Sequence, residues 1–88
     1  MERYEFRNLS NMVLSHHLHR ICENITDVYK GPESAKALAI LDELGTRGTT
    51  ADMWMPSIRK NKNFKDLVAL RYATNSLLNN YFADRTNN

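Results

Sequence analysis

Residue types that are scarce in this 88-residue chain exclude two architectures at the outset. A single cysteine, Cys22, excludes an intramolecular disulfide framework and fits a reducing compartment. No run of 18 apolar residues is present, so the sequence offers no candidate for a membrane-spanning helix. The first seven residues, MERYEFR, contain no apolar stretch of the kind that signal peptides carry. We therefore expect a cytoplasmic protein without a membrane-bound segment.

Neither sign of charge dominates the composition. Twelve lysines and arginines stand against ten aspartates and glutamates, so the net charge of +2 does not by itself indicate nucleic acid or an acidic partner. The basic residues are nevertheless unevenly distributed, because five of them fall between positions 59 and 71, where Asp66 is the one acidic residue. These five are Arg59, Lys60, Lys62, Lys65 and Arg71.

Alternating strand patterns, internal repeats and low-complexity segments are also missing, whereas helical spacing is clear in the first third of the chain. Apolar residues recur there at intervals of three and four, which predicts an amphipathic helix over about residues 10–30. The apolar stripe consists of Leu14, Leu18, Ile21, Ile25 and Val28.

The few glycines and prolines mark helix boundaries. Gly31-Pro32 ends the first predicted helix and begins a second over about residues 32–44, because glycine adopts cap conformations and proline suits a first helical position. Residues 45–48 then predict a turn. Thr49 with Asp52 resembles a capping box ahead of a short helix, ADMWM.

A second break follows at Pro56, after which a helix is predicted to restart either at Ser57 or with Asn63 as its N-cap. Apolar side chains at intervals of three and four from Phe64 onward predict a last helix over about residues 63–83.

Together these elements predict an all-α fold in one domain, residues 1–88, organised as a small bundle of three to four helices. The two long helices, about 10–30 and 63–83, are expected to pack antiparallel, with the shorter helices between them. A domain of this size buries only about 60–65% of the surface that its unfolded chain exposes, so self-association would add to its stability.

The stretch from Tyr72 to Ala83 has twelve residues without a charge, which is unusual for a helix in a small monomer. We expect it to contact a second subunit or another protein. Trp54, close to the break at Pro56, belongs to a residue type that is enriched in binding hot spots, and a plug that closes the end of the small core is its competing interpretation. The predicted interface consists of Trp54, Ala73, Ser76, Leu77, Asn80, Tyr81 and Phe82. The protein is therefore expected to be at least a homodimer.

Metal-binding and catalytic patterns are weak. His16, His19 and Glu23 share a helix face, but Arg20 lies among them and would repel a divalent cation, so solvent-facing histidines are the better interpretation. Cys22 has no identifiable orienting group or oxyanion donors, and we interpret it as a buried, inert thiol. We expect no metal, no cofactor and no enzymatic activity.

Residues 45–50, GTRGTT, combine flexible glycines, hydroxyl groups and an arginine ahead of a helix start, which are the parts of an anion site. The Gly-Lys-Ser/Thr ending of a P-loop is missing, and an ordinary capped turn is the better interpretation of the segment. One hypothesis retains a small phosphorylated ligand held between subunits by Arg47, Thr49 and Arg71.

The basic segment 47–71 suggests a helix-turn-helix as an alternative, in which residues 56–67 enter the major groove. Asn61 and Asn63 are poor helix formers and speak against it, and a solvated basic loop is the competing interpretation. The candidate contacts to nucleic acid or an anion are Arg47, Thr49, Arg59, Lys60, Lys62 and Arg71.

These observations favour a small non-enzymatic regulator, inhibitor or adaptor that acts through helical protein-protein contacts and self-association. A viral or mobile-element accessory protein that binds a host component is one form that we consider for it. The alternatives are a nucleic-acid-binding regulator that uses residues 47–71 and a binder of a small phosphorylated ligand between subunits.

Overall fold

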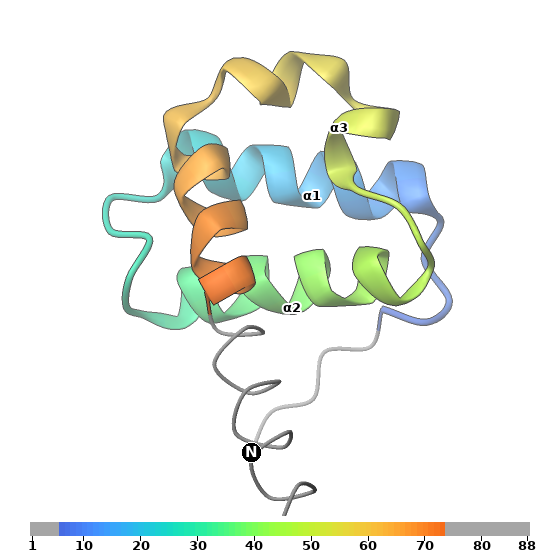
Figure 1. The fold of residues 1–88 in the computed structure, drawn as a ribbon, viewed down its shortest axis with the longest axis horizontal. Coiled ribbons are helices and arrows are strands. Elements are labelled where there is room, and N and C mark those ends of the chain that lie inside the picture. Colours follow the sequence, from blue (N-terminus) through green and yellow to red (C-terminus); the bar gives the residue numbers. More distant parts are fainter. Residues whose placement is uncertain (1–5, 74–88) are drawn as a thin grey trace, which may run out of the picture.

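The computed structural model describes residues 6–73, and throughout this range the chain is built from helices and the loops between them (Figure 1). The predicted all-α fold class is confirmed. The elements in chain order are α1 (Asn11–Asn24), α2 (Pro32–Thr46), α3 (Ala51–Trp54), the 3-10 helix η1 (Pro56–Lys60) and the α-helical residues 62–73.

Helix α1 begins where the sequence predicts and ends earlier. Ser10 is its N-cap, and the Ser10 hydroxyl accepts a hydrogen bond from the backbone N–H of Val13 at 3.2 Å. The predicted end near residue 30 is wrong, because the helix stops at Asn24 and Ile25 is already extended.

The early end of α1 has a local cause in the segment 25–28. Isoleucine, threonine, aspartate and valine follow one another here, and all four are weak helix formers. Asp27 also accepts a hydrogen bond from the backbone N–H of Tyr29 at 2.9 Å, which favours a turn over a helix. Val28 is nevertheless buried and Ile25 packs on the core, so both side chains of the apolar stripe reach the interior from a loop.

Helix α2 begins at the predicted Gly31-Pro32 boundary. Gly31 has a φ of 99°, a left-handed value that suits glycine, and Pro32 is the first helical residue. The buried hydroxyl of Ser34 donates to the backbone oxygen of Val28 and so ties the preceding loop to this helix. The chain leaves α2 through Gly48, whose φ is 75°.

The next two breaks differ in detail from the prediction. Thr50, not Thr49, precedes α3, and its hydroxyl bonds the Asp52 carboxylate instead of a backbone N–H, so the predicted capping box is not formed. After η1, the helical residues begin at 62. Asn61 caps them, because its side-chain oxygen accepts from the N–H of Phe64 at 3.1 Å.

Asn63, the predicted cap, makes a different contact. Its side-chain amide donates to the backbone oxygens of Cys22 at 2.9 Å and Ile25 at 3.3 Å. These two carbonyls lie at the end of α1, where backbone oxygens lack partners within the helix. Asn63 therefore attaches the start of helical residues 62–73 to the end of α1.

The helix that lies side by side with α1 and runs antiparallel to it is α2 (Figure 1). α3 packs against α1 as well. Residues 62–73 cross both long helices and reach α2, so the expected antiparallel partner of α1 is replaced by α2 (Figure 1). None of the helices in the described range is long and apolar enough to cross a membrane.

One hydrophobic core joins all of these elements. Its buried members are Phe6, Leu14, Leu18, Ile21, Cys22, Val28, Ala37, Ile40, Leu41, Leu44, Ala51, Ile58, Phe64 and Leu67.

Candidate functional site

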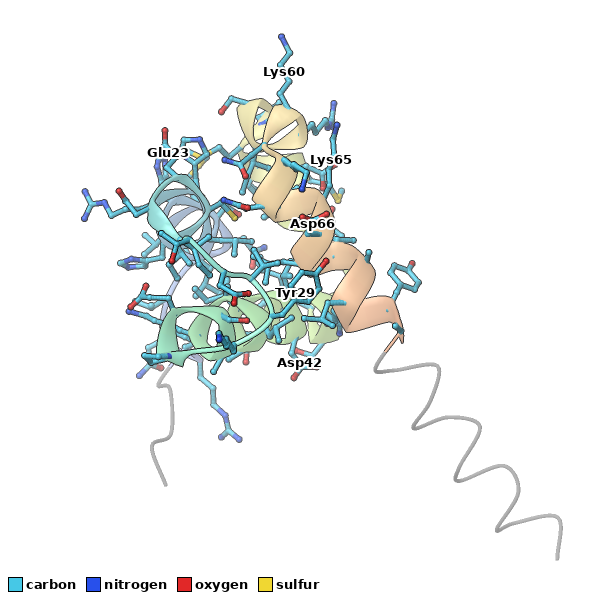
Figure 2. All side chains as sticks on the ribbon, turned by 90° about the vertical axis from the view of Figure 1, so that its left-hand side faces the viewer. Glu23, Tyr29, Asp42, Lys60, Lys65 and Asp66 are labelled. Atoms are coloured by element: carbon cyan, nitrogen blue, oxygen red, sulfur yellow. The ribbon has the colours of Figure 1, made fainter. Side chains whose placement is uncertain are left out.

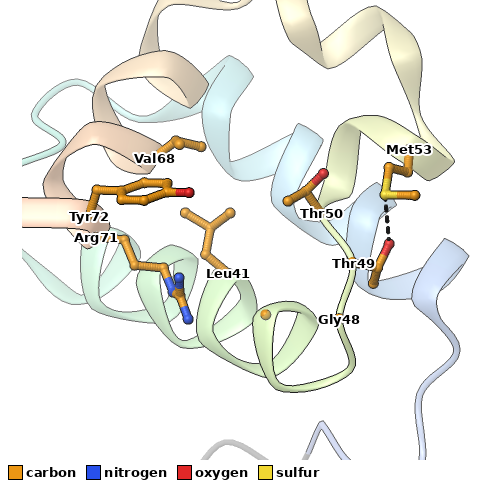
Figure 3. A pocket seen from close by; sticks show the side chains of 9 residues that line it. Leu41, Gly48, Thr49, Thr50, Met53, Val68, Arg71 and Tyr72 are labelled. Atoms are coloured by element: carbon orange, nitrogen blue, oxygen red, sulfur yellow. Dashed lines mark hydrogen bonds between the residues drawn. The ribbon is translucent and has the colours of Figure 1, made fainter. Parts of the chain in front are cut away.

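A pocket of about 290 Å³ lies between α2, the segment 48–53 and the helical residues 62–73 (Figure 3). Leu41 points from α2 toward Val68 and Tyr72, with Thr50 and Met53 on the other side (Figure 3). Larger hollows in the described range, of about 340, 430 and 440 Å³, are lined mainly by polar and charged side chains. The first pocket is lined by Leu41, Gly45, Gly48, Thr49, Thr50, Met53, Val68, Arg71 and Tyr72.

Its apolar side chains divide into a buried floor and an exposed rim. Leu41 is 5% exposed, and Val68 is partly buried. Met53 and Tyr72, at the rim, are 63% and 70% exposed. Large apolar side chains held this far into solvent beside a hollow are typical of an interaction surface.

The rim at Met53 is fixed by hydrogen bonds around Thr49. The Thr49 hydroxyl donates to the sulfur of Met53 at 3.2 Å and accepts from the indole N–H of Trp54 at 2.8 Å. Thr49 itself is buried. Its hydroxyl is therefore occupied, which weakens the hypothesis that Thr49 contacts an anion, while Trp54 is held close to the pocket.

Arg71 crosses from the last described helix to the end of α2. Its guanidinium lies so close to Gly45 that a Cβ at that position would be 2.6 Å from Nη2. Nη2 also donates to the carboxylate of Asp42 at 3.3 Å. A cation over the last turn of α2 is favoured by the helix dipole. Among the described residues no partner is found for the buried Nε of Arg71.

Arg47 lies away from this pocket and uses its guanidinium to hold the chain together. It donates to the Glu43 carboxylate at 2.9 Å, to the Leu9 oxygen at 2.8 Å and to the Asn11 side-chain oxygen at 2.9 Å. Two further bonds reach the backbone oxygens of Phe6 at 2.9 Å and Arg7 at 3.4 Å. All five N–H groups of Arg47 are thus occupied, and none is left for a phosphorylated ligand.

The basic segment is partly neutralised by nearby carboxylates. Arg59 pairs with Asp52 at 3.1 Å, and Lys62 pairs with Asp66 at 3.3 Å. A hydrogen bond from Thr50 and the pairing with Arg59 hold the pKa of Asp52 below its ordinary value.

Lys60 and Lys65 are exposed, and no ion pair involving either is found within residues 6–73 (Figure 2). The helix proposed to enter the major groove, residues 56–67, is interrupted at Asn61 between η1 and the next helix. Residues 56–67 therefore do not form the single helix that the helix-turn-helix alternative places in the major groove.

The histidines and Cys22 lie along α1. His16 and His17 are exposed, and His19 lies 3.3 Å from the carboxylate of Glu23. No group of three or more potential metal ligands comes together in the part of the chain that the structure describes. Cys22 is buried, and burial raises the pKa of its thiol to about 12, so the reactive thiolate is disfavoured.

Two of the predicted interface residues can be located. Ala73 is exposed, and Trp54 is 39% exposed beside the pocket. The other five, Ser76, Leu77, Asn80, Tyr81 and Phe82, lie outside the described residues.

Sequence reasoning missed most of the pocket. In the sequence, Leu41 and Val68 are indistinguishable from core residues, and nothing there singles out Met53. Gly45 gave no signal either, because the sequence predicts a turn over residues 45–48, whereas α2 continues to Thr46. Tyr72 was visible as the first residue of the uncharged stretch.

Comparison of the chain with protein-family models, with curated proteins and with solved structures finds no match.

Proposed function

We propose that this protein is a small non-enzymatic regulator or adaptor that acts by binding other protein chains through the pocket and its rim. The observation that carries the proposal is the position of Met53 and Tyr72, two strongly exposed apolar side chains on either side of a hollow floored by Leu41. Methionine offers a flexible, polarisable contact, and aromatic side chains are enriched in binding hot spots.

The arrangement favours an apolar side chain of a partner over a small polar ligand. Thr49 and Thr50 both have side-chain partners within the protein, and Arg71 already pairs with Asp42. A partner side chain that entered the pocket would remove apolar surface of Met53 and Tyr72 from water, which is favourable by about 25 cal/mol per Å².

Neither alternative function is supported by a comparable observation. A phosphorylated ligand would need free donors on Arg47 and Thr49, and both residues have theirs engaged within the protein. Nucleic acid would meet a basic segment in which Arg59 and Lys62 are paired with carboxylates.

Photo-crosslinking tests the proposal with a closely matched control. A benzophenone amino acid replaces Tyr72 in one variant and Tyr29 in another, because these two tyrosines are 70% and 69% exposed on different parts of the fold. After irradiation in the cells that produce the protein, adducts to a protein other than this one are expected at position 72 and not at position 29. Equal yields of such adducts at the two positions, or none at 72, would contradict the proposal.

A further inference from the structure

The pocket lining contains one charged side chain, Arg71, whose counter-charge, Asp42, lies outside the lining. Arg71 and Asp42 form an ion pair at its edge, and the remaining lining residues are uncharged. A partner that brought a carboxylate or an ammonium group would have to remove it from water without a free counter-charge, which is unfavourable. The pocket is therefore complementary to an uncharged, apolar segment.

The chain itself contains a segment of this kind. From Tyr72 to Ala83 it has no charged residue, and the segment includes Leu77, Leu78, Tyr81 and Phe82. Residues 74–83 lie outside the described residues, but the two residues before them, Tyr72 and Ala73, are described. Tyr72 lines the pocket, and Ala73 is the next residue. The segment therefore begins at the rim of the pocket.

We propose that residues 74–83 of a second copy of this chain occupy the pocket, so that two copies exchange these segments about a two-fold axis. This inference rests on the proposed function, because it assigns an occupant to the same surface. The spacing of Phe64, Leu67, Leu77 and Tyr81 predicts one continuing helix, and a helix that continues straight cannot turn back into the pocket at its own base. A two-fold axis beside Tyr72 directs each segment to the other copy and forms the same contact twice.

The oligomeric state of the full chain is the first measurement. Sedimentation of the wild type is compared with that of Met53→Lys, which alters the rim, and Leu77→Glu, which alters the segment. Met12→Lys is the control, because Met12 is also exposed, at 46%, but lies on α1 away from the pocket. We expect the wild type to be a dimer at micromolar concentration. The dissociation constant should be about 100-fold higher in Met53→Lys and in Leu77→Glu, and unchanged in Met12→Lys.

Mixing the two weakened variants separates segment exchange from other modes of association. A heterodimer of Met53→Lys with Leu77→Glu has one unaltered pocket that receives one unaltered segment, and its second contact sets a lysine against a glutamate. The dissociation constant of the heterodimer is therefore expected to lie within about 10-fold of the wild-type value. Recovery on mixing also shows that neither variant is simply unfolded.

Several outcomes would overturn the inference. A wild type that sediments as a monomer would overturn it, and so would a monomer in which the segment occupies the pocket of its own chain. Dissociation by Leu77→Glu without any effect of Met53→Lys would show that the segments pair with each other. A monomeric wild type that still crosslinks a foreign protein through position 72 would leave the proposed function standing without this inference. A dimer that passes the mixing test but crosslinks no foreign protein would leave the inference standing without the adaptor function.

Discussion

Replacing Arg47 by alanine should destabilise the protein more than any exposed substitution, because this side chain fastens the N-terminal segment to the end of α2. Four of its five hydrogen bonds reach residues 6–11, and the fifth reaches Glu43 in α2. The alanine variant removes all five donors and leaves the oxygens of Phe6, Leu9 and Asn11 without these partners.

The size of the effect follows from the burial of these groups. A hydrogen bond from a charged donor contributes about 1.5–3 kcal/mol when its partner cannot be rehydrated. The Arg47 side chain is 22% exposed, so water replaces part of what is lost. We expect a decrease of about 3 kcal/mol in the free energy of unfolding, a large fraction of the roughly 4–13 kcal/mol available to a domain of this size. The midpoint of thermal unfolding should fall by about 12–24 °C.

Urea unfolding followed by the fluorescence of Trp54, the single tryptophan, measures this decrease. Arg59→Ala is the control, since Arg59 is 61% exposed and pairs with one carboxylate, so its loss should cost less than about 1 kcal/mol. Arg47→Lys keeps the charge but not the planar set of donors, and should recover less than about half of the loss. A change of less than about 0.5 kcal/mol in Arg47→Ala would refute the reasoning.

Three further predictions concern single positions. Asn61→Asp keeps a hydrogen-bond acceptor at the helix start, so the free energy of unfolding should change by less than about 0.5 kcal/mol. Asn63→Asp places a carboxylate against two carbonyl oxygens, so the free energy of unfolding in urea should decrease by about 2–3 kcal/mol. Equal effects of the two variants would show that the two roles are misassigned. Gly45→Ala should displace the flexible guanidinium of Arg71, and the thermal midpoint should rise because alanine has a helix propensity up to about 1 kcal/mol better than glycine. A clear decrease in the midpoint would show that the displaced contact stabilises the fold. Burial raises the pKa of Cys22 from 9.0 to about 12, so as pH rises the thiol loses its proton first in the unfolded chain, and the free energy of unfolding should fall from pH 9 toward pH 12. In Cys22→Ala, the urea midpoint should lack this contribution to its decrease over the same pH range. Identical dependence of the midpoint on pH in the two proteins would contradict the prediction.

Several elements of the fold could be predicted because their signals are local. Ser10 satisfies one N–H group of the first turn, Gly31 takes the left-handed conformation, and Pro32 begins α2, all within a few residues of the helix that each one delimits. The apolar stripe of the first helix also identified core residues correctly. It could not locate the end of that helix, because Ile25 and Val28 contact the core from a loop as well as they would from a helix.

The contacts that could not be predicted join distant parts of the chain. The sequence indicates that Arg47 and Asn63 are polar, but not that each finds backbone oxygens about 40 residues away. The candidate site also depends on contacts between segments that are distant in the sequence. Helix α2 contributes Leu41, the following turn contributes Thr49, and the last described helix contributes Val68. Only their packing creates a hollow. Residues that form a rim are then distinguished from core residues by exposure, which a spacing pattern does not report.

The contacts of Arg47 also bear on the order in which the protein folds. The residues joined to its guanidinium in the N-terminal segment are up to 41 positions away, so closing this loop costs chain entropy that the packing of α1 on α2 has to offset first. The guanidinium contacts should therefore form after the transition state, and their φ-values should lie near zero. Their loss would accelerate unfolding while leaving the folding rate almost unchanged. Arg47 would then set how long a folded molecule persists before it opens, rather than how fast it forms.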